Sequence, residues 1–138
     1  MYRKILVLMA LDHKLSPTTI AIAQQLASDD AEIIALHVYE SPPSAAAVHL
    51  KDSHVKAGLE QARQLLNEKI AGYDGIKPEL ISGHTYRTIV QYARDNEIDC
   101  IVMGSHNPSL SDYLLGSTAA RVVRHAPCAV HVHRLMDA

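Results

Sequence analysis

The sequence predicts an α/β fold, a doubly wound five-stranded parallel sheet with helices on both faces. Segments typical of strands and of helices alternate along the whole chain, and the strand segments are short, nearly continuous apolar runs. At 138 residues and 48% hydrophobic, the chain has apolar material for one core but too little length for two ordinary domains. We therefore expect one domain over residues 1–138, with strand order 3-2-1-4-5 and right-handed crossovers.

The first predicted strand is the apolar run RKILVLMAL, residues 3–11. Ser16 and Pro17 then form a typical helix start, a capping hydroxyl followed by proline at the first helical position. A helical spacing predicts the buried face of that helix: Ile20, Ala23 and Ala27. A second strand is predicted over residues 32–38.

A long helix is predicted over residues 53–71, and a weaker strand follows at 78–82. One stripe of the long helix is apolar: Val55, Leu59, Ala62, Leu66 and Ile70. The next helix has its own apolar face: Tyr86, Ile89, Val90 and Ala93.

The fourth predicted strand, residues 98–104, leads into a polar loop and a short last helix. The apolar face predicted for that helix is Ala119, Val122, Val123 and Ala126. Pro127 ends the helix before a fifth strand over residues 128–133.

Charge and composition exclude several classes of protein. The net charge of −2 provides no basic field for nucleic acid or an anionic membrane, and no run approaches the roughly 20 apolar residues of a membrane span. Cys100 and Cys128 both lie in apolar runs, which is typical of buried free thiols in a reducing cytoplasm. We expect a cytoplasmic protein.

The loop after the fourth strand has features suited to an anion. In doubly wound sheets, ligands bind at the carboxyl ends of the strands where the strand order reverses, here between the first and fourth strands. Gly104 lets a ligand approach the backbone, and Gly116 and Ser117 place N–H groups and a hydroxyl at a helix start. Ordinary turn punctuation is the alternative interpretation. The six glycines form neither a dinucleotide-binding G-x-G-x-x-G nor a P-loop.

The opening YRKILVLM and the run from Ile98 to Arg134, with VMGSH and LLGSTAARVVRHAPC, resemble the universal stress protein family over essentially the full chain. The nucleotide-binding branch of that family carries G-x2-G-x9-G-[ST], which holds the phosphates of ATP or AMP. Gly104 matches its first glycine, and Gly116 with Ser117 matches its last pair. Two positions depart from it: Asn107 replaces the second glycine, and the spacer 108–115 is one residue short.

The resemblance implies a nucleotide site between the first and fourth strands. Its phosphate side would use backbone amides and hydroxyls of one set of residues: Met103, Gly104, Ser105, His106, Asn107, Gly116, Ser117 and Thr118. Val38 matches the position whose backbone holds adenine. Asp12 is a candidate for the ribose, although a gapless match puts Ala10 at the family's acid position and Asp12 fits a turn equally well. ATP, AMP or ADP, with or without Mg2+, is the implied ligand.

The resemblance also implies a homodimer through the last strand, residues 128–133, with a tetramer left open. His131 and His133 share one face of that strand, but no nearby acid or cysteine completes a metal site. Ser105 and His106 are adjacent in sequence, which rarely gives catalytic geometry. The interpretation is an adenine-nucleotide regulator or sensor of stress. The alternatives are an interaction module with a degenerate site and, less favoured, a weak ATP hydrolase.

Overall fold

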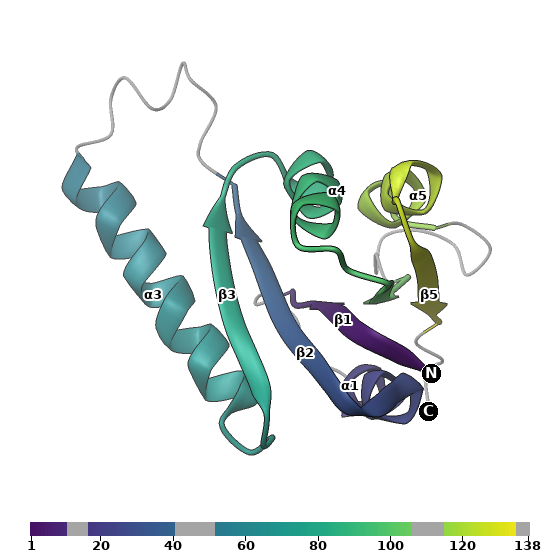
Figure 1. The fold of residues 1–138 in the computed structure, drawn as a ribbon. Helices are drawn as coiled ribbons and strands as arrows, with labels where there is room; N and C mark the ends of the chain where they lie inside the picture. Colours follow the sequence, from purple (N-terminus) through teal and green to yellow (C-terminus); the bar gives the residue numbers. More distant parts are fainter. Residues whose placement is uncertain (11–16, 41–51, 106–114, 135–138) are drawn as a thin grey trace.

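The computed structural model describes residues 1–10, 17–40, 52–105 and 115–134 (Figure 1). All the pairings between neighbouring strands are parallel, and the five-stranded sheet has the order β3-β2-β1-β4-β5, which confirms the predicted fold class and strand order. The elements in chain order are β1 (Tyr2–Leu8), α1 (Pro17–Leu26), β2 (Ala27–Tyr39), α3 (Asp52–Ile70), β3 (Ile76–Ser82), α4 (Thr85–Asp95), β4 (Cys100–Gly104), α5 (Ser117–His125) and β5 (Ala129–His133).

The helices form a layer on each face of the sheet. Helices α1 and α3 pack on one face, where Ile20 and Leu66 join Val7 and Val102 in a single buried cluster. Helices α4 and α5 lie beside one another on the opposite face (Figure 1). The second buried cluster lies beneath them: Leu6, Ile34, Leu36, Val38, Ile89, Ala93, Ile98, Ile101, Met103, Ala119 and Val122. Because consecutive strand residues face opposite sides of the sheet, each apolar run contributes side chains to both buried clusters.

Two strand boundaries differ most from the sequence-based prediction. The first strand ends at Leu8 instead of residue 11, because its pairing with β4 stops at Val7 and only β2 continues beside it. The second strand starts at Ala27, which pairs with Tyr2, so Ala27 belongs to β2 and not to the face of the first helix. Helix α1 therefore ends at Leu26 and the strand follows directly.

One residue of the predicted helix faces is also misplaced. Val123 is 46% exposed, whereas Val122 is fully buried. The buried stripe of α5 runs through Ala119 and Val122, and Val123 lies about 100° further round the helix. Arg121 on the same helix is exposed.

The amino end of the central strand pair is tied by Asp99, the residue before β4. Its carboxylate accepts hydrogen bonds from the backbone N–H groups of Arg3 (2.8 Å) and Lys4 (3.0 Å). The backbone N–H of Asp99 donates to the carbonyl of Lys4 at 3.0 Å. Within the described ranges, no helix has the length and apolar character needed to cross a membrane.

Candidate functional site

The central strands β1 and β4 separate before either one ends. Their pairing runs from Ile5–Cys100 to Val7–Val102 and then stops. Beyond it, β1 stays with β2, since the N–H of Met9 donates to the carbonyl of Leu36 at 2.9 Å. Strand β4 stays with β5 through the pair Gly104–His133. The opening between them is the point where the strand order reverses and where ligands bind in sheets of this kind.

The β4 side of the opening is held by the last strand and the last helix together. The N–H of Ser105 donates to the carbonyl of His133 at 2.9 Å. The carbonyl of Ser105 accepts a hydrogen bond of 3.3 Å from the N–H of Gly116, the N-cap of α5. Gly104 and Ser105 at the end of β4 and Gly116, eleven residues after Ser105, are therefore joined at one place.

The start of α5 presents N–H groups that the helix itself cannot satisfy. The first bond within the helix runs from the N–H of Ala120 to the carbonyl of Gly116, at 2.9 Å. The N–H groups of Ser117 and Thr118 precede it and have no carbonyl partner within the helix. Among the described residues, no side chain caps this end, and the first turn of α5 holds no acid. Such a helix end attracts an anion, and the interaction stabilises an exposed charge by about 0.3–1 kcal/mol.

The β1 side of the opening is shaped by a histidine that the sequence analysis did not single out. The ring Nδ1 of His37, half-buried in β2, lies 2.7 Å from the carbonyl oxygen of Met9. This contact fixes the backbone of β1 just after the strand ends. Ala10 follows and is exposed, and its carbonyl accepts a hydrogen bond of 3.5 Å from Lys69 Nζ of α3.

Val38 lies in β2 next to His37 and is 9% exposed. It pairs with Ile81 on β3, whereas the ladder between β1 and β2 ends at the Leu8–Leu36 pair. Strand β2 thus extends past the described part of β1, and Val38 lies near the opening. A flat apolar group could pack on the strand at this position.

Glu40, just after β2, holds the start of α4. Its carboxylate accepts hydrogen bonds from both the hydroxyl and the backbone N–H of Thr85, the latter at 3.2 Å. These bonds lower the pKa of Glu40, the hydroxyl bond most, with a smaller contribution from the positive charge of His84. The His84 side chain, at the N-cap position, makes no capping bond. The acid from β2 therefore caps α4 in its place.

The described site residues occupy three segments around the opening. Met103 is 5% exposed at the end of β4, below half-buried Gly104 and Ser105. At the start of α5, Ser117 is exposed and Thr118 half-buried. Asp12, His106 and Asn107 lie outside the described residues. Sequence reasoning missed His37 and Glu40, although both adjoin the end of a predicted strand, where ligand sites form.

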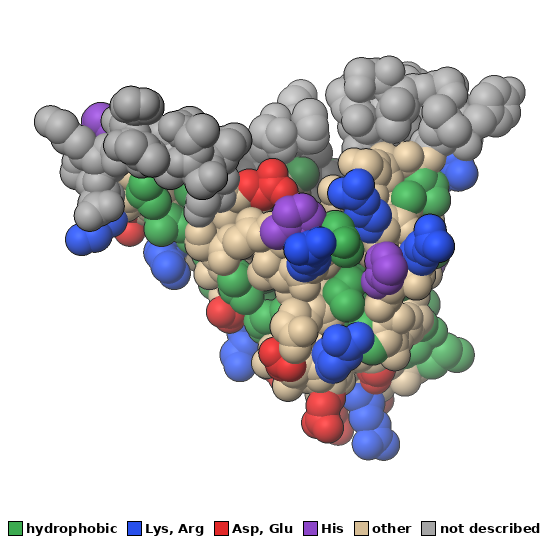
Figure 2. Space-filling view, turned by 90° about the horizontal axis from the view of Figure 1, so that it is seen from above, with side chains coloured by type: hydrophobic (Ala, Val, Ile, Leu, Met, Phe, Trp, Pro, Cys, Tyr) green, Lys and Arg blue, Asp and Glu red, His purple; other side chains and the backbone are tan. Residues whose placement is uncertain are grey.

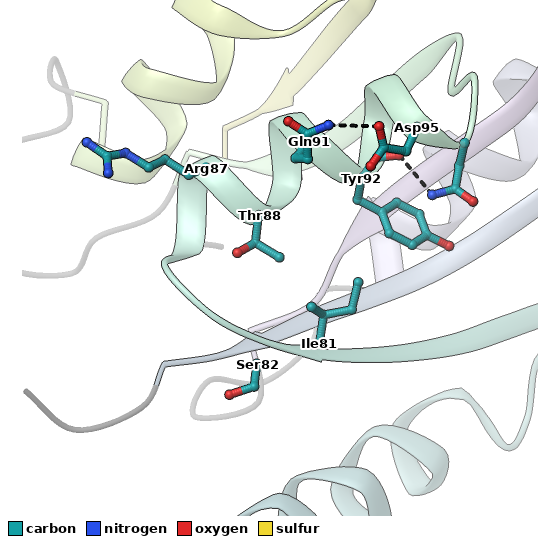
Figure 3. A pocket seen from close by; sticks show the side chains of 8 residues that line it. Ile81, Ser82, Arg87, Thr88, Gln91, Tyr92 and Asp95 are labelled. Atoms are coloured by element: carbon teal, nitrogen blue, oxygen red, sulfur yellow. Dashed lines mark hydrogen bonds between the residues drawn. The ribbon is translucent and has the colours of Figure 1, made fainter. Parts of the chain in front are cut away.

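A separate open groove lies between the end of β3 and α4 (Figure 3). Its lining residues are Ile81, Ser82, Arg87, Thr88, Gln91, Tyr92, Asp95 and Asn96. Two of its polar groups are already bonded: Gln91 Nε2 donates to Asp95 at 2.7 Å, and Asn96 Nδ2 donates to the carbonyl of Tyr92 at 3.0 Å. This groove is distinct from the opening between β1 and β4.

Comparison with known proteins places the chain in a family. The model of the universal stress protein family matches residues 1–134. The chain belongs to this family. Universal stress protein G of Salmonella typhimurium is 34% identical over 132 residues, which cover 88% of this chain and 90% of that protein.

Solved structures of the universal stress protein family share the fold. A family protein from Arabidopsis thaliana, solved with AMP bound, superposes with a TM-score of 0.63 at 19% identity, covering 97% of this chain and 92% of that one. A universal stress protein solved in complex with cAMP gives a TM-score of 0.61 at 24% identity, covering 98% of both chains. At these identities the likeness concerns the fold.

Proposed function

We propose that this universal stress protein binds ATP or a related adenine nucleotide in the opening between β1 and β4, and acts as a cytoplasmic regulator or sensor in the stress response. One observation carries the proposal: where β1 and β4 separate, the bond from Gly116 to Ser105 joins the end of β4 to an uncapped helix start. AMP and cAMP in two structures of the same fold support an adenine nucleotide as the ligand.

The phosphates would lie against Gly104 and the start of α5. Backbone N–H groups and the hydroxyls of Ser105, Ser117 and Thr118 are the donors that this region offers, and hydrogen bonds to a charged phosphate are the stronger kind. His106 and Asn107 complete the same proposed phosphate loop. Met103, buried beneath it, forms the apolar floor.

The adenosine would lie against β2. The backbone at Val38 is the proposed adenine contact. Asp12 is the proposed ribose contact. Ala10, exposed at the end of β1, offers no carboxylate there.

A divalent ion would have to come with the nucleotide. Magnesium prefers carboxylates and phosphate oxygens. In the described part of the chain, no three His, Cys, Asp or Glu side chains form a group suited to a metal. The serine hydroxyls near the phosphates could complete the coordination of an ion held mainly by phosphates and water.

We also propose that the protein forms a homodimer through residues 128–133. Strand β5 is at the edge of the sheet and pairs with β4 alone among the described strands. An edge strand with free backbone groups can pair with its copy across a two-fold axis. A dimer would place each proposed nucleotide site next to the interface, because the carbonyl of His133 at the end of β5 accepts a hydrogen bond from Ser105.

Gly116→Ala provides the experiment that tests nucleotide binding. Freshly purified protein is denatured to identify any released nucleotide, and ATP is then titrated calorimetrically into the stripped protein and into the variant. Gly116 has φ −58° and ψ 154°, which alanine adopts without strain, so the added methyl group changes mainly how closely a ligand can approach. We expect ATP affinity to fall at least about tenfold, a loss of roughly 1.4 kcal/mol.

Gly72→Ala is the matched control. A Cβ at Gly72 meets nothing within 4 Å, so its affinity should equal that of the wild type. Folded wild-type protein that carries no nucleotide and ignores ATP would refute the proposal and favour the interaction-module alternative. Phosphate release above the background of Gly116→Ala would be required before hydrolysis is considered.

A further inference from the structure

A cluster of aromatic and cationic side chains covers the outer surface of α4 and α5. Tyr86 is at its centre. The guanidinium carbons of Arg87 and Arg121 lie 5.9 Å and 5.3 Å from the centre of the Tyr86 ring. The ring of His125 stacks on it at 5.7 Å, and that of His84 meets it edge-on at 5.1 Å. We call these five residues the Tyr86 cluster. In Figure 2, blue and purple side chains gather among apolar ones on this upper face.

Among the described residues, the guanidinium groups of the Tyr86 cluster have no acidic partner. The ion pairs of the described residues join Glu32 to Lys4 and to Lys77 and involve neither Arg87 nor Arg121. Glu40 is near enough for the charge of His84 to lower its pKa, but its carboxylate is occupied by Thr85. Arginines grouped without a carboxylate repel each other in the absence of a ligand.

The Tyr86 cluster is ordered by its own contacts. Arg87 Nε donates to the Tyr86 hydroxyl at 3.4 Å, and the nearby guanidinium groups lower the pKa of that hydroxyl, Arg87 most strongly. The Tyr86 ring is half-buried against the core beneath α4 and α5, which fixes its position. A ligand would therefore immobilise fewer free side chains, which reduces the entropy cost of binding.

We propose that the Tyr86 cluster is a docking surface for an acidic peptide segment of a partner protein. Tyrosine and arginine are the residues most enriched where protein interfaces concentrate their binding energy. Each guanidinium can hold one carboxylate through two parallel hydrogen bonds, and the tyrosine ring offers apolar contact between them.

The geometry favours a peptide over a compact anion. Arg87 and Arg121 come from two different helices and both lie against the ring of Tyr86, so two carboxylates spaced along a chain can each pair with one of them. Arg87 also lines the groove between β3 and α4, at the opposite end from Asp95 (Figure 3). An extended peptide could continue from the Tyr86 cluster into that groove.

The charge of the rest of the chain disfavours nucleic acid. The net charge is −2, and nucleic-acid sites need a basic surface that extends along the phosphate backbone. We therefore take an acidic peptide as the occupant and make a nucleic acid an outcome of the test.

The test measures binding of a fluorescein-labelled peptide of alternating glutamate and glycine to the full chain, by fluorescence anisotropy at low salt. The main variant combines Arg87→Glu with Arg121→Glu, both exposed positions. We expect affinity to fall at least about tenfold. Tyr86→Leu keeps an apolar side chain against the core but removes the ring, and should weaken binding about threefold.

The matched control combines Lys56→Glu with Arg63→Glu, two exposed cations of α3. It makes the same charge change away from the Tyr86 cluster, so its affinity for the peptide should stay within about twofold of the wild-type value. Thermal melts confirm that each variant is folded. A wild-type protein that does not bind the peptide would overturn the proposal, as would equal losses in both charge-reversal variants. The proposal would also be overturned if a labelled oligothymidylate bound more tightly than the peptide and this binding were lost in the variant that combines Arg87→Glu with Arg121→Glu.

Discussion

The two ends of the β1–β4 pair are built differently. At the amino end, Asp99 accepts two backbone hydrogen bonds from the start of β1, and three consecutive residue pairs follow. At the carboxyl end, the strands separate and each is bonded to its outer neighbour, Met9 to Leu36 and Ser105 to His133. One pair of strands thus provides both the centre of the core and the edges of an opening. The stabilising bonds of Asp99 lie at one end of these two strands, and the proposed nucleotide site lies at the other.

Ile101→Ala tests the paired end with the largest expected effect. Ile101 is fully buried beneath α4 and α5 and lies next to Leu6 of β1. The truncation should lower the free energy of unfolding by about 2–5 kcal/mol, because it removes buried apolar surface and leaves a cavity. Urea denaturation measures the change. Val123→Ala on the exposed side of α5 should cost less than about 0.5 kcal/mol, and equal losses would contradict the assigned core.

Asp99→Ala tests the bonds at the amino end. The variant loses the carboxylate that binds the N–H groups of Arg3 and Lys4, so the free energy of unfolding should fall by about 1–2 kcal/mol. Urea denaturation again gives the value, with Asp30→Ala, an exposed acid of β2, as the control. If the two ends are separate in function, ATP affinity is unchanged. A loss of ATP binding by folded Asp99→Ala would show that the two ends are not separate in function.

Glu40→Ala tests an exposed acid at the carboxyl end, with the smallest effect. Its hydrogen bonds to Thr85 lower its pKa below the usual 4.5, so the carboxylate is the form that stabilises the folded protein. This stabilisation is complete above pH 4.5 and is lost as the pH falls through the lowered folded-state pKa. It should amount to no more than about 1 kcal/mol, because the group is exposed.

Unfolding free energies of wild type and Glu40→Ala from pH 7 to pH 3 measure this effect, with Glu68→Ala on α3 as an exposed control. The difference between wild type and Glu40→Ala should be constant near neutral pH and shrink in acid. A difference that grows as the pH falls would show that the sign is wrong.

The sequence predicts the fold because the fold depends on apolar periodicity, which is local. Buried runs such as the one around Ile101 and the stripe through Leu66 indicate strand and helix directly. The boundaries of the strands and helices are harder to predict from the sequence, because they depend on pairing with residues far along the chain. The first strand ends early because β4 leaves it, and Ala27 joins a strand because Tyr2 lies beside it.

Sequence reasoning reaches the candidate site only in part, for a similar reason. Gly104 and Gly116 are visible because glycine and a helix start have recognisable sequence signals. The contact of His37 with the carbonyl of Met9 has none, since it depends on the register of two strands. The Tyr86 cluster is also hidden, because it forms only when α4 and α5 pack side by side.

The direct junction of α1 and β2 shows where this protein can change in length at the amino end of its sheet. Helix α1 ends at Leu26 and β2 begins at Ala27, so no linker separates the two elements. Between the pairs Tyr2–Ala27 and Lys4–Glu32, however, β2 contains three more residues than β1. An irregularity of this kind takes up added residues before the regular ladder begins. The buried pairs from Ile5–Ile33 onward therefore keep the register that turns each side chain to its own face.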